Sequence, residues 1–192
     1  MPQRETCGRC LRKSNSIAFD ATFAAFRYTF PSDILVAAAK YRGDLAMTRT
    51  LGTLLAGAIH AQISPAALKN IDLALPIPLA PSRQAERGYN QAAEIARVVA
   101  KALSLPLASD LMRTRETEKQ ADLPLKQRAR NVRDAFSAAS LERPLAGKHV
   151  LLIDDVMTTG ATLNEAAKAL KDAGAIRVTV AVVARAVSRK SV

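Results

Sequence analysis

The chain has 192 residues, of which 49% are apolar and 23% charged, so it can bury the core of one compact domain and is not intrinsically disordered. No apolar run approaches the roughly 18 residues that span a bilayer, and the first residues lack the apolar stretch of a secretory signal, so we expect a cytoplasmic protein without a membrane span. The 28 basic against 17 acidic residues give a net charge of +11, which favours anionic partners such as nucleic acid or phosphorylated metabolites.

The only two cysteines, Cys7 and Cys10, form a C-x-x-C pair near the start of the chain. In a reducing compartment this spacing indicates metal or redox chemistry rather than a structural disulfide. A zinc site needs four ligands, and both histidines, His60 and His149, lie far away in the sequence. We therefore expect Cys7 and Cys10 to form an incomplete zinc half-site, because two thiolates cannot close a tetrahedral shell.

The first third of the chain predicts a hairpin and two helices. Residues 16–30 alternate loosely between apolar and polar side chains, as in a short hairpin. A helix is expected from Ser32 or Asp33 to about Tyr41, since either residue can act as the N-cap. The second helix covers residues 44–62, where leucines and small apolar residues recur on one helical face.

The middle of the chain predicts a mixture of short strands and helices. Residues 71–77 are apolar and end among prolines, which indicates a buried strand. A helix is predicted over residues 88–103, a strand near 107–112, a polar loop over 113–123 and a helix over 125–134.

The clearest unit comes last. Residues 149–153 predict a continuous apolar strand, residues 154–161 a turn, residues 162–173 a helix that Gly174 caps, and residues 178–183 a second strand. This βαβ pattern predicts a parallel sheet with helices on both faces. Ligands bind such sheets outside the carboxyl ends of the strands, so the residues after Ile153 and Ile77 are the expected site.

The predicted turn combines acidic and hydroxyl side chains. Asp154 and Asp155 can accept hydrogen bonds from a sugar diol or hold a hydrated divalent cation, and Gly160 lets a ligand approach the backbone. Thr158, Thr159 and the following helix start supply hydroxyl and amide donors for a phosphate. The pattern fits a ribose 5-phosphate, although the two acids could also cap the helix or orient the turn. The chain contains neither a P-loop nor a dinucleotide-binding glycine motif.

Residues 150–162, Val-Leu-Leu-Ile-Asp-Asp-Val-Met-Thr-Thr-Gly-Ala-Thr, resemble the phosphoribosyl pyrophosphate motif of type I phosphoribosyltransferases. Further motifs resemble the ComF/GntX family of competence-associated phosphoribosyltransferase-like proteins. These are Pro76-Ile-Pro78, Arg83, Glu86-Arg-Gly-Tyr-Asn-Gln91, Arg113-x-Arg115 with Gln120, Leu123 and Arg128, Asn131-Val-x-x-Ala-Phe136, and Lys40-Tyr-Arg-Gly-Asp44. The family usually has a four-cysteine zinc knuckle, of which Cys7 and Cys10 match the second half.

The resemblance implies a type I phosphoribosyltransferase fold, a twisted and mostly parallel sheet with helices on both faces. It divides the chain into an N-terminal segment, residues 1–45, with the partial knuckle, the hairpin and a hood over the site, and an α/β domain, residues 46–192.

The resemblance also implies roles for single residues. Asp154 and Asp155 are the catalytic pair that binds the ribose hydroxyls, and the 5′-phosphate lies on the turn that follows. Arginines and a lysine, together with Mg²⁺, hold the pyrophosphate. The implied phosphate-binding residues are Thr158, Thr159, Gly160, Ala161 and Thr162, and the pyrophosphate-binding residues are Arg83, Arg87, Arg115 and Lys119.

Two functions remain open at this stage. The first is an enzyme that uses phosphoribosyl pyrophosphate and Mg²⁺ to transfer the phosphoribosyl group to an unknown nitrogen acceptor, in association with DNA uptake and competence. The second is a non-catalytic competence factor that senses a ribose phosphate or binds single-stranded DNA, which the charge of +11 also fits.

Overall fold

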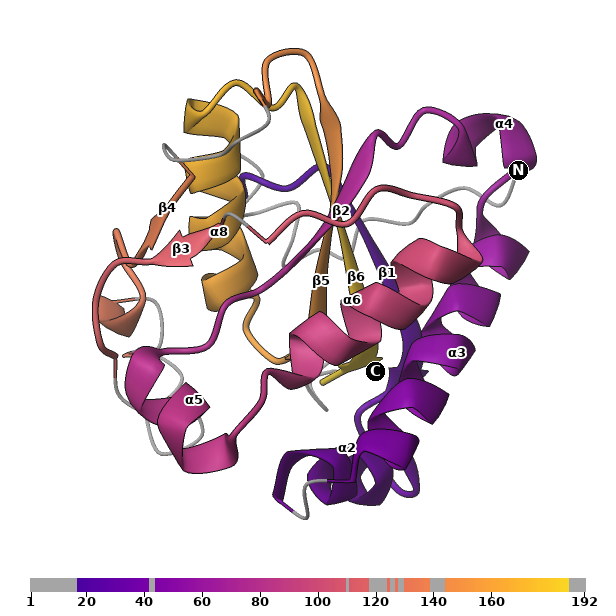
Figure 1. The fold of residues 1–192 in the computed structure, drawn as a ribbon, viewed down its shortest axis with the longest axis vertical. Coiled ribbons are helices and arrows are strands. Elements are labelled where there is room, and N and C mark those ends of the chain that lie inside the picture. The colour runs from indigo at the N-terminus through magenta and orange to yellow at the C-terminus, as the bar shows by residue number, and fades with distance from the viewer. Residues whose placement is uncertain are drawn as a thin grey trace, which may run out of the picture.

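The computed structural model describes residues 17–41, 44–109, 111–117, 124, 127, 130–138 and 144–186. Four parallel strands form its main sheet (Figure 1). Their order across the sheet is β1 (Ala21–Arg27), β6 (Arg177–Arg185), β5 (His149–Met157) and β2 (Leu73–Pro76). The short strands β3 (Met112–Arg113) and β4 (Phe136–Ser137) pair antiparallel in a separate two-stranded sheet.

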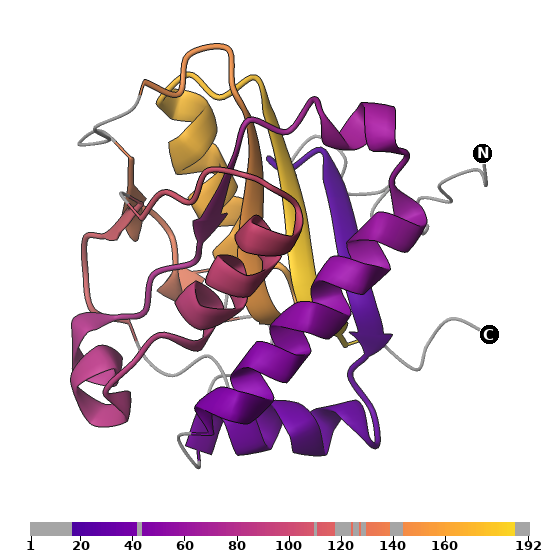
Figure 2. The same ribbon diagram turned by 45° about the vertical axis from the view of Figure 1, so that its right-hand side comes forward.

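Helices cover both faces of the main sheet, as the apolar pattern predicts. The helices α3 (Leu45–Gln62) and α6 (Gln91–Ala102) pack together on one face, and α8 (Ala161–Asp172) lies on the other (Figures 1 and 2). Shorter helices are α2 (Ser32–Tyr41), α4 (Pro65–Leu68) and α5 (Pro81–Arg87). Within the described ranges, no helix has the length and apolar character needed to cross a bilayer. The parallel sheet with helices on both faces confirms the predicted α/β fold.

The two central strands explain the continuous apolar runs of the sequence. Val150 and Leu152 of β5 pack into the core under α8, whereas Leu151 and Ile153 pack into the core under α3 and α6. Successive strand residues point to opposite faces, so a strand buried on both faces must be apolar at every position. The pairing of β5 with β6 places the end of β5 at the carboxyl edge of the sheet.

The hairpin prediction for residues 16–30 is wrong. Residues 21–27 form the single strand β1, which pairs in parallel with β6 and places Phe23 opposite Ala181. An alternating pattern predicts a strand but does not identify its partner, and here the partner is the edge of the main sheet rather than a neighbouring strand. Part of the N-terminal segment is thus built into the same sheet as β5.

Two other predictions change in detail. The strand expected near residues 107–112 is reduced to a bridge between Leu107 and Ala74 and to the two residues of β3. The turn expected over residues 154–161 is shorter, because β5 continues to Met157, opposite Arg185 of β6. Most of the helix expected over 125–134 lies outside the described residues.

Candidate functional site

A cavity of about 700 Å³ opens at the carboxyl ends of β5 and β2. Its walls come from α2, the loop after β2, α5, the start of α6, and the stretch from Asp154 to Leu163. Figure 2 shows α2 crossing below the ends of the strands. This is the edge at which the sequence predicts a ligand.

The turn between β5 and α8 is suited to bind a phosphate. Thr158 and Thr159 are exposed, and Gly160 has a φ of 77°, a left-handed conformation that glycine adopts without strain. The helix starts at Ala161, and its first residues line the cavity, so the positive end of the helix dipole lies at the cavity. All five residues predicted to bind phosphate, Thr158 to Thr162, line the cavity.

The acidic pair lies on the last part of β5. The Asp154 carboxylate accepts the backbone N–H of Asp155 at 2.8 Å, and Asp155 Oδ2 lies 3.1 Å from Nζ of Lys40. Burial, followed by the charge of Asp155, raises the pKa of Asp154 to about 7. Burial alone would lower the pKa of Lys40, but the charges of Asp155 and Asp154 outweigh it and raise that pKa.

Arginines also line the cavity. Arg83 and Arg87 lie four residues apart on α5 and both line the cavity. Arg83 Nη2 donates to the Thr117 carbonyl at 3.2 Å, and Arg87 Nη1 donates to Gln91 Oε1 at 3.1 Å. These two predicted pyrophosphate-binding residues therefore share one cavity with the acidic pair.

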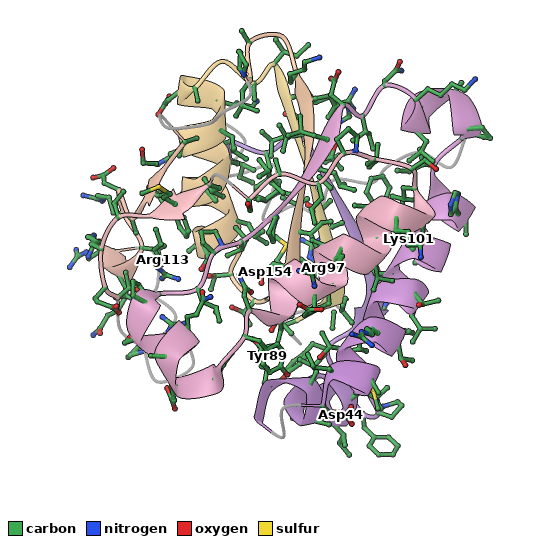
Figure 3. All side chains as sticks on the ribbon, viewed as in Figure 1. Asp44, Tyr89, Arg97, Lys101, Arg113 and Asp154 are labelled. Atoms are coloured by element: carbon green, nitrogen blue, oxygen red, sulfur yellow. The ribbon has the colours of Figure 1, made fainter. Side chains whose placement is uncertain are left out.

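The third arginine of the cavity is Arg113, not Arg115. Arg113 lines the cavity and lies near Asp154 in Figure 3. Arg115 is exposed, and its Nη2 donates to the carbonyls of Asn131 at 3.1 Å and Arg133 at 2.7 Å. Arg115 is not among the residues that line the cavity, so its position does not support the predicted pyrophosphate contact. Lys119 lies outside the described residues, as do Cys7 and Cys10.

The loop that follows Arg113 is attached to the start of α5. The carboxylate of Glu116 accepts the Ser82 N–H at 2.9 Å and the Ser82 hydroxyl at 2.8 Å. These two hydrogen bonds lower the pKa of Glu116. The attachment brings the segment 113–117 against the helix that presents Arg83 and Arg87.

Two lining residues have roles that the sequence did not identify. Gln91 is 1% exposed, and among the described buried side chains its Nε2 is one of the atoms without a hydrogen-bond partner. A buried amide donor facing a cavity is stabilised when a ligand supplies an acceptor. The second of these lining residues is Lys40. Only its place in the Lys-Tyr-Arg-Gly-Asp motif could have indicated it.

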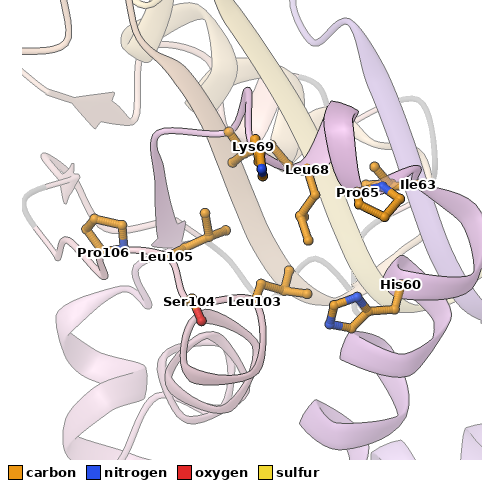
Figure 4. Close-up of a pocket in the computed structure, with 10 residues that line it drawn as sticks. His60, Ile63, Pro65, Leu68, Lys69, Leu103, Ser104, Leu105 and Pro106 are labelled. Carbon is orange, nitrogen blue, oxygen red and sulfur yellow. The ribbon is translucent and has the colours of Figure 1, made fainter.

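A second cavity of about 440 Å³ lies between the end of α3, α4 and the segment after α6 (Figure 4). Its lining is mainly apolar, with Ile63, Leu68 and Leu103 among its walls, and it contains no carboxylate. It lacks the paired acidic and basic walls of the larger cavity. Of these two cavities, only the one at the carboxyl ends of the strands is lined by both carboxylates and arginines.

The parallel sheet, with an acidic pair at the end of β5 and a glycine-containing turn before α8, indicates a phosphoribosyltransferase-type domain. In agreement, the phosphoribosyl transferase domain family matches residues 87–192, more than half of the chain. The chain belongs to the ComF family of phosphoribosyltransferase-like proteins within this class.

Named relatives support this assignment. The chain is 34% identical over 181 residues to competence protein F of Haemophilus influenzae, covering 94% of this chain and 78% of the relative. It is 33% identical over 176 residues to the DNA utilization protein YhgH of Escherichia coli O157:H7, covering 91% and 75%. It is also 35% identical over 100 residues to competence protein ComFC of Bacillus subtilis, covering 52% and 38%.

Proposed function

We propose that the chain binds phosphoribosyl pyrophosphate with Mg²⁺ and transfers the phosphoribosyl group to a nitrogen acceptor. One observation carries the proposal: Asp154 and Asp155, an amide-bearing turn and three arginines all line a single cavity. Together, these acceptor, anion-binding and cationic groups suit a sugar diol that carries both a phosphate and a pyrophosphate.

Each wall of the cavity has a separate task in this proposal. The carboxylates of Asp154 and Asp155 accept hydrogen bonds from the ribose hydroxyls, and the turn around Gly160 binds the 5′-phosphate through amide groups. Arg83, Arg87 and Arg113 face the pyrophosphate, whose charge they offset. Arginine is suited to this task because its planar guanidinium donates two parallel hydrogen bonds to phosphate oxygens.

The described residues fit Mg²⁺ as an ion shared with the substrate. They contain no group of three or more histidine, cysteine or carboxylate side chains that could enclose a metal ion. Mg²⁺ is commonly held by one or two carboxylates together with substrate phosphates and water, and the carboxylates that line the cavity are Asp154, Asp155 and Glu86. When bound, the ion would offset charge on the departing pyrophosphate.

The reaction is a displacement at the anomeric carbon. The bond from C1 to the pyrophosphate oxygen breaks with its electron pair on the oxygen, and a bond from the acceptor nitrogen to C1 forms. Positive charge that develops on the ribose ring is stabilised by the neighbouring carboxylates, as in other oxocarbenium-like transition states. The proton lost by the nitrogen can pass to an acidic side chain of the pair, since a pKa of about 7 suits Asp154 to proton transfer at neutral pH.

Calorimetric titration with phosphoribosyl pyrophosphate and Mg²⁺ tests the proposal. We expect saturable, Mg²⁺-dependent binding that falls by at least about a hundredfold in the Asp154→Asn, Asp155→Asn double variant, because two charge-assisted hydrogen bonds are weakened. Asp172→Asn, a change on the exposed end of α8, is the control and leaves binding unchanged. Equal binding by the double variant and the wild type would exclude the proposed site. Release of pyrophosphate with an amine acceptor present tests the transfer step.

The names of the relatives favour a role in competence or DNA use, and the charge of +11 suits a nucleic-acid partner. The alternative function is therefore a non-catalytic factor that binds single-stranded DNA or senses a ribose phosphate. It predicts DNA affinity that falls steeply with salt, since counterion release dominates such binding. Titration of a single-stranded oligonucleotide at about 50 and about 200 mM salt tests it. A steep loss of affinity at the higher salt concentration, without pyrophosphate release in the transfer assay, would favour this alternative.

A further inference from the structure

Lys40 connects the N-terminal part of the chain to the acidic pair. Its Nζ lies 3.1 Å from Asp155 Oδ2, and the two side chains are only 22% and 15% exposed. Exposed ion pairs contribute little because water and salt screen them, but this pair is largely shielded. The contact therefore constrains where the Asp155 carboxylate can point.

The helix that carries Lys40 is fixed from a second side. The Tyr89 hydroxyl donates to the backbone carbonyl of Ala39, the residue directly before Lys40. Tyr89 belongs to the connection between α5 and α6, and Figure 3 shows it between the start of α6 and α2. The ammonium group is thus held over the end of β5 by the backbone of its own helix as well as by Asp155.

Lys40 engages only one oxygen of Asp155. Within the described residues, Oδ1 of Asp155 takes part in no hydrogen bond, whereas Oδ2 pairs with Lys40. The neighbouring Asp154 is already committed on one side, since its Oδ1 accepts the Asp155 backbone N–H. A ligand hydroxyl therefore meets a carboxylate that has one oxygen anchored and one oxygen available.

We propose that Lys40 is a positioning residue that orients Asp155 to recognise the ribose diol, an inference that rests on the proposed function. By holding Oδ2, it directs Oδ1 toward the ligand and offsets the repulsion between two adjacent carboxylates. Without this anchor the Asp155 side chain can rotate between staggered conformers, and its hydrogen bond to the diol is lost for part of the time. The N-terminal hood then contributes directly to sugar recognition.

The test compares two ligands with the same phosphate. Ribose 5-phosphate has the ring hydroxyls, whereas tetrahydrofurfuryl phosphate has the ring and the phosphate but no hydroxyls. A change in the overall charge of the cavity alters both affinities equally and cancels in their ratio. A change in the orientation of Asp155 alters only the affinity for ribose 5-phosphate.

We expect the wild type to prefer ribose 5-phosphate by about tenfold or more, since one charge-assisted hydrogen bond corresponds to that factor. In Lys40→Met the preference falls to within about threefold. Lys40→Arg retains most of it, because the guanidinium keeps the charge and a donor. The control is Lys69→Met, which removes the same charge from an exposed residue at the smaller cavity and leaves the preference unchanged.

The outcomes separate this proposal from the function on which it rests. If the wild type prefers ribose 5-phosphate and Lys40→Met keeps that preference, Lys40 does not position Asp155, although the proposed sugar site stands. If the wild type binds neither ligand or does not distinguish them, the proposed function fails and this inference fails with it. Hydrogen exchange of residues 32–41 in Lys40→Arg verifies that α2 remains folded in the variant that is expected to retain the preference.

Discussion

The guanidinium of Arg113 lies over the ring of Phe136, with Cζ 5.3 Å from the ring centroid. Phe136 belongs to β4, which pairs with β3, so the short antiparallel sheet serves to place this arginine at the cavity. Arg113 also donates to the Thr117 hydroxyl, and its Nε has no partner among the described residues. Burial, followed by the charge of Arg83, lowers the pKa of Arg113 to about 10, so it remains a cation at neutral pH.

The first prediction distinguishes Arg113 from Arg115. Arg113→Met should lower the affinity for inorganic pyrophosphate by about tenfold, because one charge-assisted interaction is lost. Arg115→Met removes the same charge two residues away, where the guanidinium contacts the carbonyls of Asn131 and Arg133, and should change that affinity by less than about twofold. Calorimetric titration of both variants with inorganic pyrophosphate measures the difference. A larger loss in Arg115→Met would instead support the contact that the sequence predicted.

The sequence predicted the fold where burial dictates the pattern. Strand β5 and helix α8 were predictable because both must bury side chains, the strand at each position from His149 to Ile153 and the helix at every third or fourth. Helix α5 was not predicted because it buries no residue and so has no apolar face. Only Pro81 at its start and Gly88 at its end, with a φ of 74°, signal it locally.

The sequence predicted those site residues that are close together in the chain. Asp154, Asp155 and the turn to Thr162 form one continuous stretch, so their chemistry could be interpreted from one motif. The contact of Lys40 depends on how α2 packs across the end of the sheet, which no local pattern specifies. The choice between Arg113 and Arg115 depends likewise on the pairing of β3 with β4.

The second prediction concerns the stability cost of Asp154. Its pKa is raised from an ordinary 3.8 to about 7, so between these values the folded protein retains a proton that the unfolded chain has lost. By linkage, stability falls as the pH rises through this window and stays low above it. Asp154→Asn removes the titration while its amide oxygen can still accept the Asp155 N–H. We expect this variant to be more stable than the wild type by about 1 kcal/mol or more at pH 8, since one pKa unit corresponds to about 1.4 kcal/mol.

Urea unfolding at pH 4, 6 and 8 measures this effect. The advantage of Asp154→Asn should be small at pH 4, grow through pH 6 and be largest at pH 8. Asp172→Asn serves as the control, because it removes an exposed carboxylate at the far end of α8. A variant that is less stable than the wild type at pH 8 would show that Asp154 contributes to stability in its ionised form.

The third prediction compares two glycines in different backbone conformations. Gly160 has a φ of 77°, and a Cβ added there would lie 2.7 Å from the Met157 Cε. The methionine end can move, but the left-handed backbone costs an alanine about 1 kcal/mol. Gly57 lies inside α3, where an added Cβ would have no other atom within 4 Å, so alanine there should stabilise the protein by about 0.5–1 kcal/mol.

The two glycine substitutions should also differ in their effect on ligand binding. Gly160→Ala alters the backbone that begins α8, so it should weaken binding of ribose 5-phosphate by about tenfold as the amide groups move away from the 5′-phosphate. Gly57→Ala lies on a helix outside the cavity lining and should leave that affinity unchanged. Thermal unfolding and calorimetric titration of both variants test the pair. Unaltered sugar-phosphate binding in Gly160→Ala would mean that the turn after β5 does not hold the phosphate, because a phosphate bound there would contact the backbone that this substitution displaces.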